Sequence, residues 1–131
     1  MHRVDFFSLI KNYKVVFLDS YGVLKNHEGR IDGVPETIEY LRSRGTIVKI
    51  LTNDASRSRQ QQVERFDALG LNGLTIEQII TSGTLARLFL QDKKIKGKIG
   101  YLGTENAADY ILHIDRDSVP ISAIDLEDCD D

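Results

Sequence analysis

The fold is decided by the stretch Lys14-Val15-Val16-Phe17-Leu18-Asp19, an apolar run that stops at a carboxylate. Such a run is typical of a strand in a parallel sheet with both faces covered, although periodicity alone does not exclude a buried helix. In open α/β sheets, ligands bind beyond the carboxyl ends of the strands. The run therefore predicts that Asp19 lies at the ligand-binding edge of an α/β domain.

Strand and helix patterns alternate along the rest of the chain. Short apolar runs that favour strands recur at 47–51, 79–81 and 98–102. Stretches that favour helices lie between and after them, at 35–44, 57–69, around 85–89 and at 105–113. The alternation predicts the α/β class with a Rossmann-like parallel sheet.

Local signals fix several helix ends and faces. Pro35 suits the first position of a helix, and Gly45 suits the left-handed position after its end. Ser56 is predicted to cap the helix over 57–69. The apolar stripe Leu85, Leu88 and Phe89 is predicted to pack in the core.

Composition narrows the class of protein. The chain has 131 residues, a hydrophobic fraction of 41% and a net charge of -3, so a broad cationic face for nucleic acid or anionic lipid is not expected. Its single cysteine, Cys129, cannot form an internal disulfide and favours a reducing compartment. No apolar run has the length of a membrane span, and no signal-peptide pattern opens the chain. We expect a cytoplasmic location and no membrane partner.

Two predicted strand ends carry polar side chains. Asp19-Ser20-Tyr21-Gly22 follows the first strand, and Thr52-Asn53-Asp54 follows the second. Neighbouring parallel strands would bring the two groups together, and a carboxylate beside hydroxyl and amide donors could transfer a phosphoryl group with a divalent cation present. The alternative is structural, since Asp commonly forms turns or caps helices and Thr-Asn is a common loop pair.

At these motifs the sequence resembles the haloacid dehalogenase superfamily. The first block is Val15-Val16-Phe17-Leu18-Asp19-Ser20-Tyr21-Gly22-Val23-Leu24. The second group is similar to the subgroup of sugar-phosphate and nitrophenyl-phosphate phosphatases, and comprises 33–38, 50–58, 79–83 and 100–104. The resemblance extends over nearly the whole chain.

The resemblance implies a mechanism. Asp19 would be the nucleophile that forms an aspartyl-phosphate, and it would also bind Mg²⁺ together with the main-chain carbonyl of Tyr21. Thr52, the backbone around Asn53, and Gly22 would bind the phosphoryl group of the substrate. Fixed donors of this kind stabilise the charge that spreads over the phosphoryl oxygens. The implied substrates are small phosphorylated metabolites such as sugar phosphates.

Two departures from the family pattern matter. The family usually has a second aspartate where Tyr21 stands, and that aspartate protonates the leaving group and activates water. A phenol, with an unperturbed pKa of about 10, is a poor base at neutral pH but could donate a proton. We therefore keep Tyr21 as a candidate catalytic side chain beside the alternative that it only packs in the loop.

The family's later lysine and Gly-Asp pair are not found in a suitable setting. The family order then predicts that 1–81 is the N-terminal part of a hydrolase core and 82–131 the beginning of an α/β cap domain. On this interpretation the chain is the first part of a longer phosphatase, or a shortened descendant, and is inactive alone.

Two other functions stay open at this stage. A receiver domain with Asp54 as phosphoacceptor, helped by Thr81 and Lys98, would also be α/β and of similar length. It would need more elements before its acceptor, and an acidic pair where Ser20 follows Asp19. A non-catalytic interaction module that keeps the fold is the other alternative, and the sequence leaves the possibility of a homo-oligomer open.

Overall fold

The first sheet consists of three parallel strands. The computed structural model describes residues 5–93, 98–103, 109–112 and 118–121. The strands are β1 (Val15–Asp19), β2 (Ile47–Thr52) and β3 (Ile79–Thr81), in the order β1-β2-β3. Helix α1 (Phe6–Ile10) precedes them, α2 (Val34–Ser43) and α3 (Arg59–Ala68) connect them, and the 3₁₀ turn η1 (Ile76–Gln78) leads into β3.

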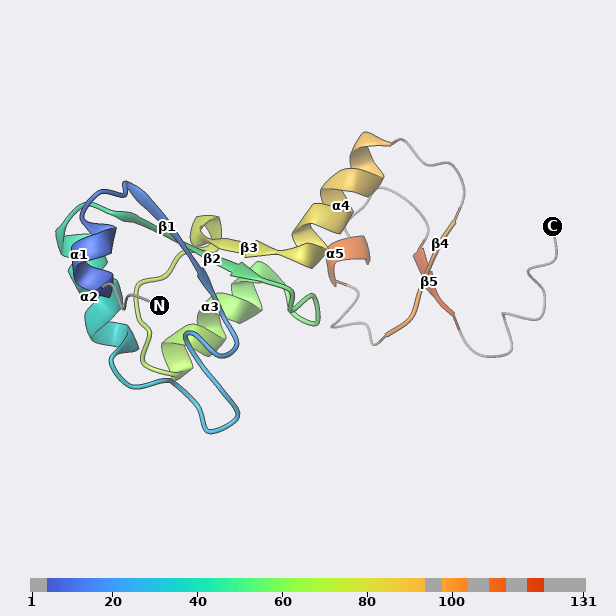
Figure 1. Cartoon of the computed structure of the whole chain (residues 1–131). Coiled ribbons are helices and arrows are strands. Elements are labelled where there is room, and N and C mark those ends of the chain that lie inside the picture. Colours follow the sequence, from blue (N-terminus) through green and yellow to red (C-terminus); the bar gives the residue numbers. More distant parts are fainter. Residues whose placement is uncertain (1–4, 94–97, 104–108, 113–117, 122–131) are drawn as a thin grey trace.

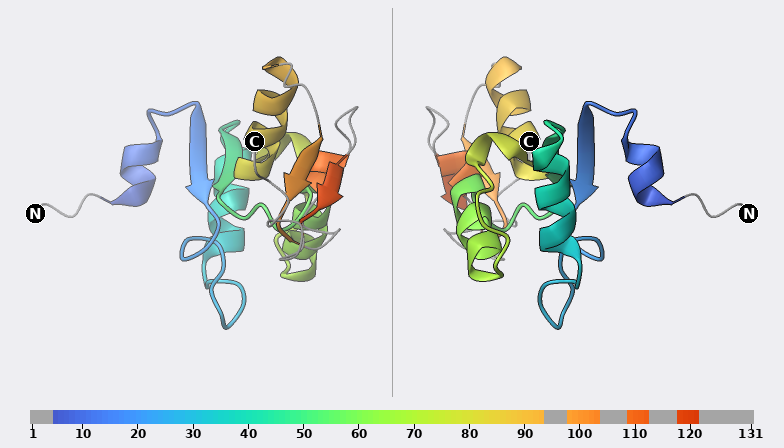
Figure 2. Two further views of the ribbon diagram at one scale, coloured as in Figure 1. Left: turned by 90° about the vertical axis from the view of Figure 1, so that its right-hand side faces the viewer. Right: turned by 90° about the vertical axis from the view of Figure 1, so that its left-hand side faces the viewer.

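A second group of elements follows the first sheet. It comprises α4 (Ser82–Asp92), β4 (Ile99–Tyr101), α5 (Asp109–Leu112) and β5 (Ser118–Pro120). Strands β4 and β5 pair with each other in parallel and form a separate sheet (Figures 1 and 2). The predicted α/β class and parallel sheet are confirmed. The predicted strand 98–102 exists, but it belongs to the second sheet.

The core lies on one face of the first sheet. Val48 and Ile50 of β2 are buried, and they pack with Ile38 and Leu41 of α2 and Phe66 of α3. Both crossover helices cover this face because successive right-handed connections in one direction place their helices on the same side. The cluster is the only large buried apolar group in the described residues.

The other face of the sheet is uncovered within the described residues. Phe17 of β1 is 58% exposed, and Ile47 and Leu51 of β2 are 52% and 48% exposed. The expectation that the first strand is covered on both faces was therefore wrong for this chain. Residues alternate between the two faces of a strand, and only the α2 and α3 side is filled.

Helix α3 begins later than predicted. Its N-cap is Ser58, whose Oγ accepts from the N–H of Gln61 at 3.2 Å, while the Gln61 side chain accepts from the N–H of Ser58 at 2.9 Å. The predicted cap, Ser56, donates its hydroxyl to Asp54 instead. The sequence holds two serines two residues apart, and this reciprocal capping box selects the second.

The apolar stripe of α4 is not core. Leu85, Leu88 and Phe89 are 56%, 52% and 57% exposed, which contradicts the predicted core packing. Helix α4 continues beyond β3 and away from α2 and α3, so the main core does not reach its stripe (Figure 1). Of the helix predicted over 105–113, Asp109–Leu112 is helical, and 104–108 and 113 lie outside the described residues, as does Cys129.

The ends of α2 agree with the sequence signals. The helix starts at Val34 with Pro35 in its first turn, and Gly45 after its end has a φ of 72°. Within the described ranges, no helix combines the length and apolar character that crossing a bilayer requires.

The two faces of β2 allow a matched test of the packing. Ile50 is fully buried, whereas its neighbour Leu51 is 48% exposed. We expect Ile50→Ala to lower the free energy of unfolding by about 2–5 kcal/mol, because it leaves a cavity in the core. Leu51→Ala should cost less than about 1 kcal/mol. Urea denaturation of the two variants measures the difference, and equal losses would contradict a one-sided core.

Candidate active site

Asp19 ends β1 at the carboxyl edge of the sheet. Its side chain is exposed, and its Oδ1 accepts from the N–H of Ser20 at 2.8 Å. Asp19 is paired with Leu51, so the strand pleat turns its side chain to the uncovered face. The carboxylate is thus held by a backbone donor and open to a ligand.

The turn after Asp19 leaves the carbonyl of Tyr21 outside its hydrogen bonds. The N–H of Gly22 donates to the carbonyl of Lys25 at 2.7 Å, and the N–H of Lys25 donates to the carbonyl of Ser20 at 3.1 Å. These two bonds form a parallel bridge between Tyr21 and Lys25 that does not use the Tyr21 carbonyl. Gly22 has a φ of 84°, a value that few other residues adopt.

The side chain of Tyr21 is 64% exposed. It therefore contributes little to packing, and its phenol lies where solvent or a ligand can reach it.

Thr52 ends β2, and Asn53 follows it at the same edge. Thr52 is 6% exposed, and its Oγ1 accepts from the N–H of Asp54 at 3.2 Å. Thr52 pairs with Thr81, so its side chain points to the covered face while that of Asp19 points to the uncovered one. The sheet brings the two residues to one edge, but from opposite faces.

The loop after Thr52 is fixed to the elements that follow β3. The hydroxyl of Ser82 donates to the carbonyl of Asn53 at 3.0 Å, and the hydroxyl of Tyr110 donates to the carbonyl of Arg57. The side chain of Asn53 itself is exposed. The backbone of this loop is therefore held in place, while the side chain of Asn53, its first residue, faces solvent.

Asp54 organises the same loop. Its carboxylate accepts from the N–H of Ser56 at 3.0 Å and forms an ion pair with Arg57 at 3.3 Å. Burial raises the pKa of Asp54, but the hydrogen bonds from Ser56, the nearby side-chain amide of Gln62 and the charge of Arg57 outweigh it and lower the pKa from 3.8 to about 2. Asp54 is therefore ionised at neutral pH and orders the loop.

The ionised form of Asp54 should stabilise the fold in a defined pH range. A carboxyl whose folded pKa is depressed contributes stability above its unfolded pKa, and loses it as pH falls through the folded value. We expect Asp54→Asn to cost about 1 kcal/mol at pH 7, allowing for solvent screening. The deficit should shrink between about pH 4 and 2. Denaturation across this range tests it, with Asp67→Asn as control; a constant deficit would contradict the linkage.

Lys25 is a nearby cation that the sequence analysis did not select. It is 8% exposed, and burial, followed by the charge of Arg65, lowers its pKa, while the charge of Asp54 acts in the opposite direction. A lysine in a polar loop normally signals solvated surface. Nothing in the sequence pattern distinguished this one, because its burial arises from the turn that folds back onto Ser20.

Two hard oxygen donors could hold a magnesium ion. They are the exposed carboxylate of Asp19 and the Tyr21 carbonyl that the bridge leaves out. Mg²⁺ commonly keeps several waters and takes one or two carboxylates with substrate phosphates, so this pair fits part of its coordination shell. Groups of three or more His, Cys, Asp and Glu side chains suited to a metal do not occur in the described ranges.

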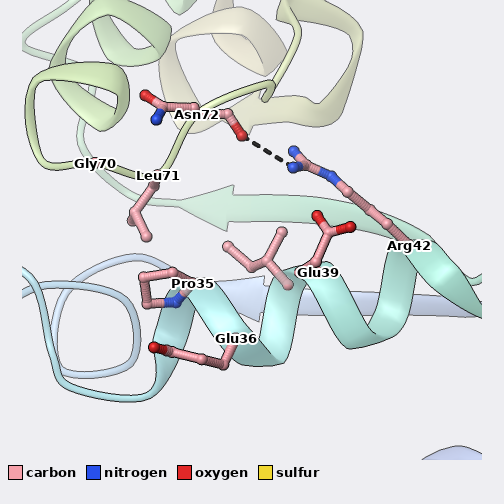
Figure 3. Close-up of a pocket in the computed structure, with 8 residues that line it drawn as sticks. Pro35, Glu36, Glu39, Arg42, Gly70, Leu71 and Asn72 are labelled. Carbon is pink, nitrogen blue, oxygen red and sulfur yellow. Dashed lines mark hydrogen bonds between the residues drawn. The ribbon is translucent and has the colours of Figure 1, made fainter.

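A larger cavity lies away from these residues. It measures about 350 Å³ and lies between α2 and the loop after α3, where Arg42 donates to the carbonyl of Asn72 at 2.9 Å (Figure 3). Glu36 and Glu39 also line it, and none of the predicted site residues does. Its mixed charge and its position give no support to a role in phosphoryl transfer.

Comparison with known proteins identifies relatives of this chain. The family described as haloacid dehalogenase-like hydrolase matches residues 16–115. Phosphoglycolate phosphatase 2 of Arabidopsis thaliana is 34% identical over 97 residues, which are 70% of this chain and 32% of that protein. Chronophin of Bos taurus is 33% identical over 95 residues, 69% of this chain and 32% of chronophin.

A solved structure agrees with these relatives. A possible sugar phosphatase of the same superfamily from Cytophaga hutchinsonii is 36% identical, with a TM-score of 0.84 over 97% of this chain and 46% of that one. The chain spans about a third of the length of the two curated relatives. The family match covers most of the sequence and includes Asp19, Thr52 and Asn53. This chain belongs to the haloacid dehalogenase-like hydrolases.

Proposed function

We propose that the protein in which these residues occur is a magnesium-dependent phosphatase that acts through an aspartyl-phosphate on Asp19. The observation that carries the proposal is the position of Asp19, exposed at the carboxyl end of β1 in a chain of this hydrolase family. A carboxylate nucleophile splits hydrolysis into two easier steps: it attacks phosphorus, releases the alcohol, and is then freed by water.

Neighbouring groups have defined roles in this proposal. When bound, Mg²⁺ screens the repulsion between the phosphate and the carboxylate, and Asp19 and the Tyr21 carbonyl would hold it. Thr52 and the backbone around Asn53 and Gly22 bind the phosphoryl oxygens. The exposed phenol of Tyr21 is the candidate proton donor to the leaving group.

Small phosphorylated metabolites are the proposed substrates. The related phosphoglycolate phosphatase and possible sugar phosphatase support this class, because each name describes a small phosphorylated acid or sugar. In the same proposal, 1–81 belongs to the hydrolase core and 82–131 to the cap, and 1–131 in isolation is inactive. The break between the two sheets at Thr81 and Ser82 supports that division.

Metal removal tests the proposal. With the full-length protein, we expect EDTA to abolish phosphate release from a panel of small phosphate monoesters, and excess Mg²⁺ to restore it, because the metal is required to bring two anions together. A malachite green assay measures the released phosphate. Full activity in EDTA would contradict the magnesium requirement, and failure of every monoester would favour a non-catalytic module.

The receiver alternative has less support. It requires Asp54 as phosphoacceptor, yet that carboxylate is already bound by Ser56 and paired with Arg57. Its other required hydroxyl, on Thr81, is buried and hydrogen-bonded to Thr84. Acetyl phosphate labelling of Asp54 in place of Asp19 would reverse this preference.

A further inference from the structure

A second cavity lies between the start of α3 and the first turns of α4. Its volume is about 180 Å³, and it is lined by Arg59, Gln60, Ile76, Thr84, Arg87 and Tyr110. None of the residues proposed for phosphoryl transfer lines it. Its lining residues come from the start of α3, from η1, and from α4 and α5, of which α4 and α5 lie next to one another in Figure 1.

The lining of this cavity is cationic. It includes two guanidinium groups and no carboxylate, in a chain whose net charge is -3. The nearest carboxylate effect involves the exposed Glu77, whose pKa is lowered by hydrogen bonding from Thr75 and, to a smaller extent, by the charge of Arg59. This influence is not an ion pair, since neither Arg59 nor Arg87 forms one with any described residue. Like charges that share a partly enclosed space repel one another, and a bound anion relieves that repulsion.

Arg87 has an unused donor in this place. Its Nε is buried and has no hydrogen-bond partner in the described part of the chain. A buried donor on a charged group is costly when it is left unsatisfied. A guanidinium presents planar N–H groups that match the oxygens of phosphate or carboxylate, so the two arginines that line the cavity can bind an oxyanion.

The other walls suit the same ligand. Helix α3 begins at Arg59, and its positive end favours negative charge nearby. The ring of Tyr110 packs so closely against Gly83 that an added Cβ atom would overlap it, so this part of the wall is closely fitted. The volume lies below the ~300–1,000 Å³ typical of pockets for drug-sized ligands, which favours a small ion or terminal group.

From these observations we propose that the cavity lined by Arg59 and Arg87 binds a phosphate-sized oxyanion. The ligand is either free inorganic phosphate or the terminal phosphate of a small molecule. The site is separate from the chemistry of Asp19, so it stands whether or not the protein is a phosphatase.

Calorimetric titration of the protein with inorganic phosphate tests this site. We expect Arg87→Gln to raise the dissociation constant by roughly tenfold or more, since a charge-assisted hydrogen bond is lost. Arg59→Gln should weaken binding in the same direction. Arg87→Lys, which keeps the charge but loses the Nε donor, should fall between the wild type and Arg87→Gln.

Two controls separate this site from other phosphate sites. Arg44→Gln removes an arginine that stacks on Tyr40, and should leave binding unchanged. Thr52→Val disturbs the proposed catalytic edge; with EDTA present to remove the magnesium that this edge requires, it should also leave binding at the arginine cavity unchanged. Loss of binding in Thr52→Val with retention in both Arg59→Gln and Arg87→Gln would overturn the proposal, as would no binding by the wild type.

A second titration identifies the source of the anion. Glycerol phosphate is added in place of inorganic phosphate to the same set of variants. Tighter binding of the ester, lost in Arg87→Gln, assigns the site to phosphorylated molecules, and tighter binding of inorganic phosphate assigns it to the free ion. If the dissociation constants of both ligands are the same in Arg59→Gln and Arg87→Gln as in the wild type, the site is rejected. Matching thermal unfolding of Arg59→Gln and Arg44→Gln excludes a folding defect.

Discussion

Asp19→Asn should reduce phosphate release by about 10³-fold or more, because removal of a nucleophile eliminates the covalent route. The change replaces one carboxylate oxygen with an amide nitrogen and leaves the size of the side chain nearly constant. Asp19 is exposed at the end of its strand, so loss of its charge should have little effect on the core. Steady-state release of phosphate from the best monoester of the panel measures the effect.

A nearby aspartate provides the matched control. Asp32 is also exposed, lies between β1 and α2, and has no assigned role, so Asp32→Asn should keep wild-type activity. Phosphate incorporation that withstands acid but is released by hydroxylamine should appear in the wild type and be absent from Asp19→Asn. Activity that survives the loss of Asp19 would remove the central element of the proposed function.

Tyr21→Asp should raise the rate of hydrolysis by about 10²-fold, the lower range of general acid–base catalysis. An aspartate at this position could protonate the leaving group and then activate water, whereas a phenol is a poor base at neutral pH. The side chain is 64% exposed, so the substitution should not disturb packing. Single-turnover kinetics would locate the gain, which we expect in the breakdown of the aspartyl-phosphate.

Tyr21→Phe separates the phenol from the backbone at the same position. Metal binding by the Tyr21 carbonyl should survive this change, because the carbonyl belongs to the main chain. If the phenol donates a proton, Tyr21→Phe should slow release of the alcohol while the magnesium requirement is unchanged. If Tyr21→Asp is slower than the wild type, the expected gain is contradicted and the phenol itself is needed at this position.

The alternation of apolar runs was sufficient to predict the first sheet and its helices. β1, β2, β3 and α2 are found where the sequence places them, because apolar runs, proline and glycine act locally. The start of α3 could not be fixed in this way. Ser56 and Ser58 are both good caps, and only the contacts of Asp54 and Gln61 decide between them.

The missed features depend on contacts distant in the sequence. The stripe of Leu85 and Phe89 has the period of a core helix, but the pattern does not tell which surface covers it. The burial of Lys25 likewise arises from a turn in the backbone. For the site, sequence predicts that Asp19 and Thr52 share an edge, while the register of the strands adds that they point to opposite faces.

The hydrogen bonds from Ser82 to Asn53 and from Tyr110 to Arg57 have a mechanical consequence. They join the backbone that follows β2 to α4 and α5, on the other side of β3. A rotation of those helices must therefore break both bonds or carry the loop with it. If this loop binds the phosphoryl group as proposed, the geometry of that site is set not by the first sheet alone but also by the angle at which the second group of elements is held.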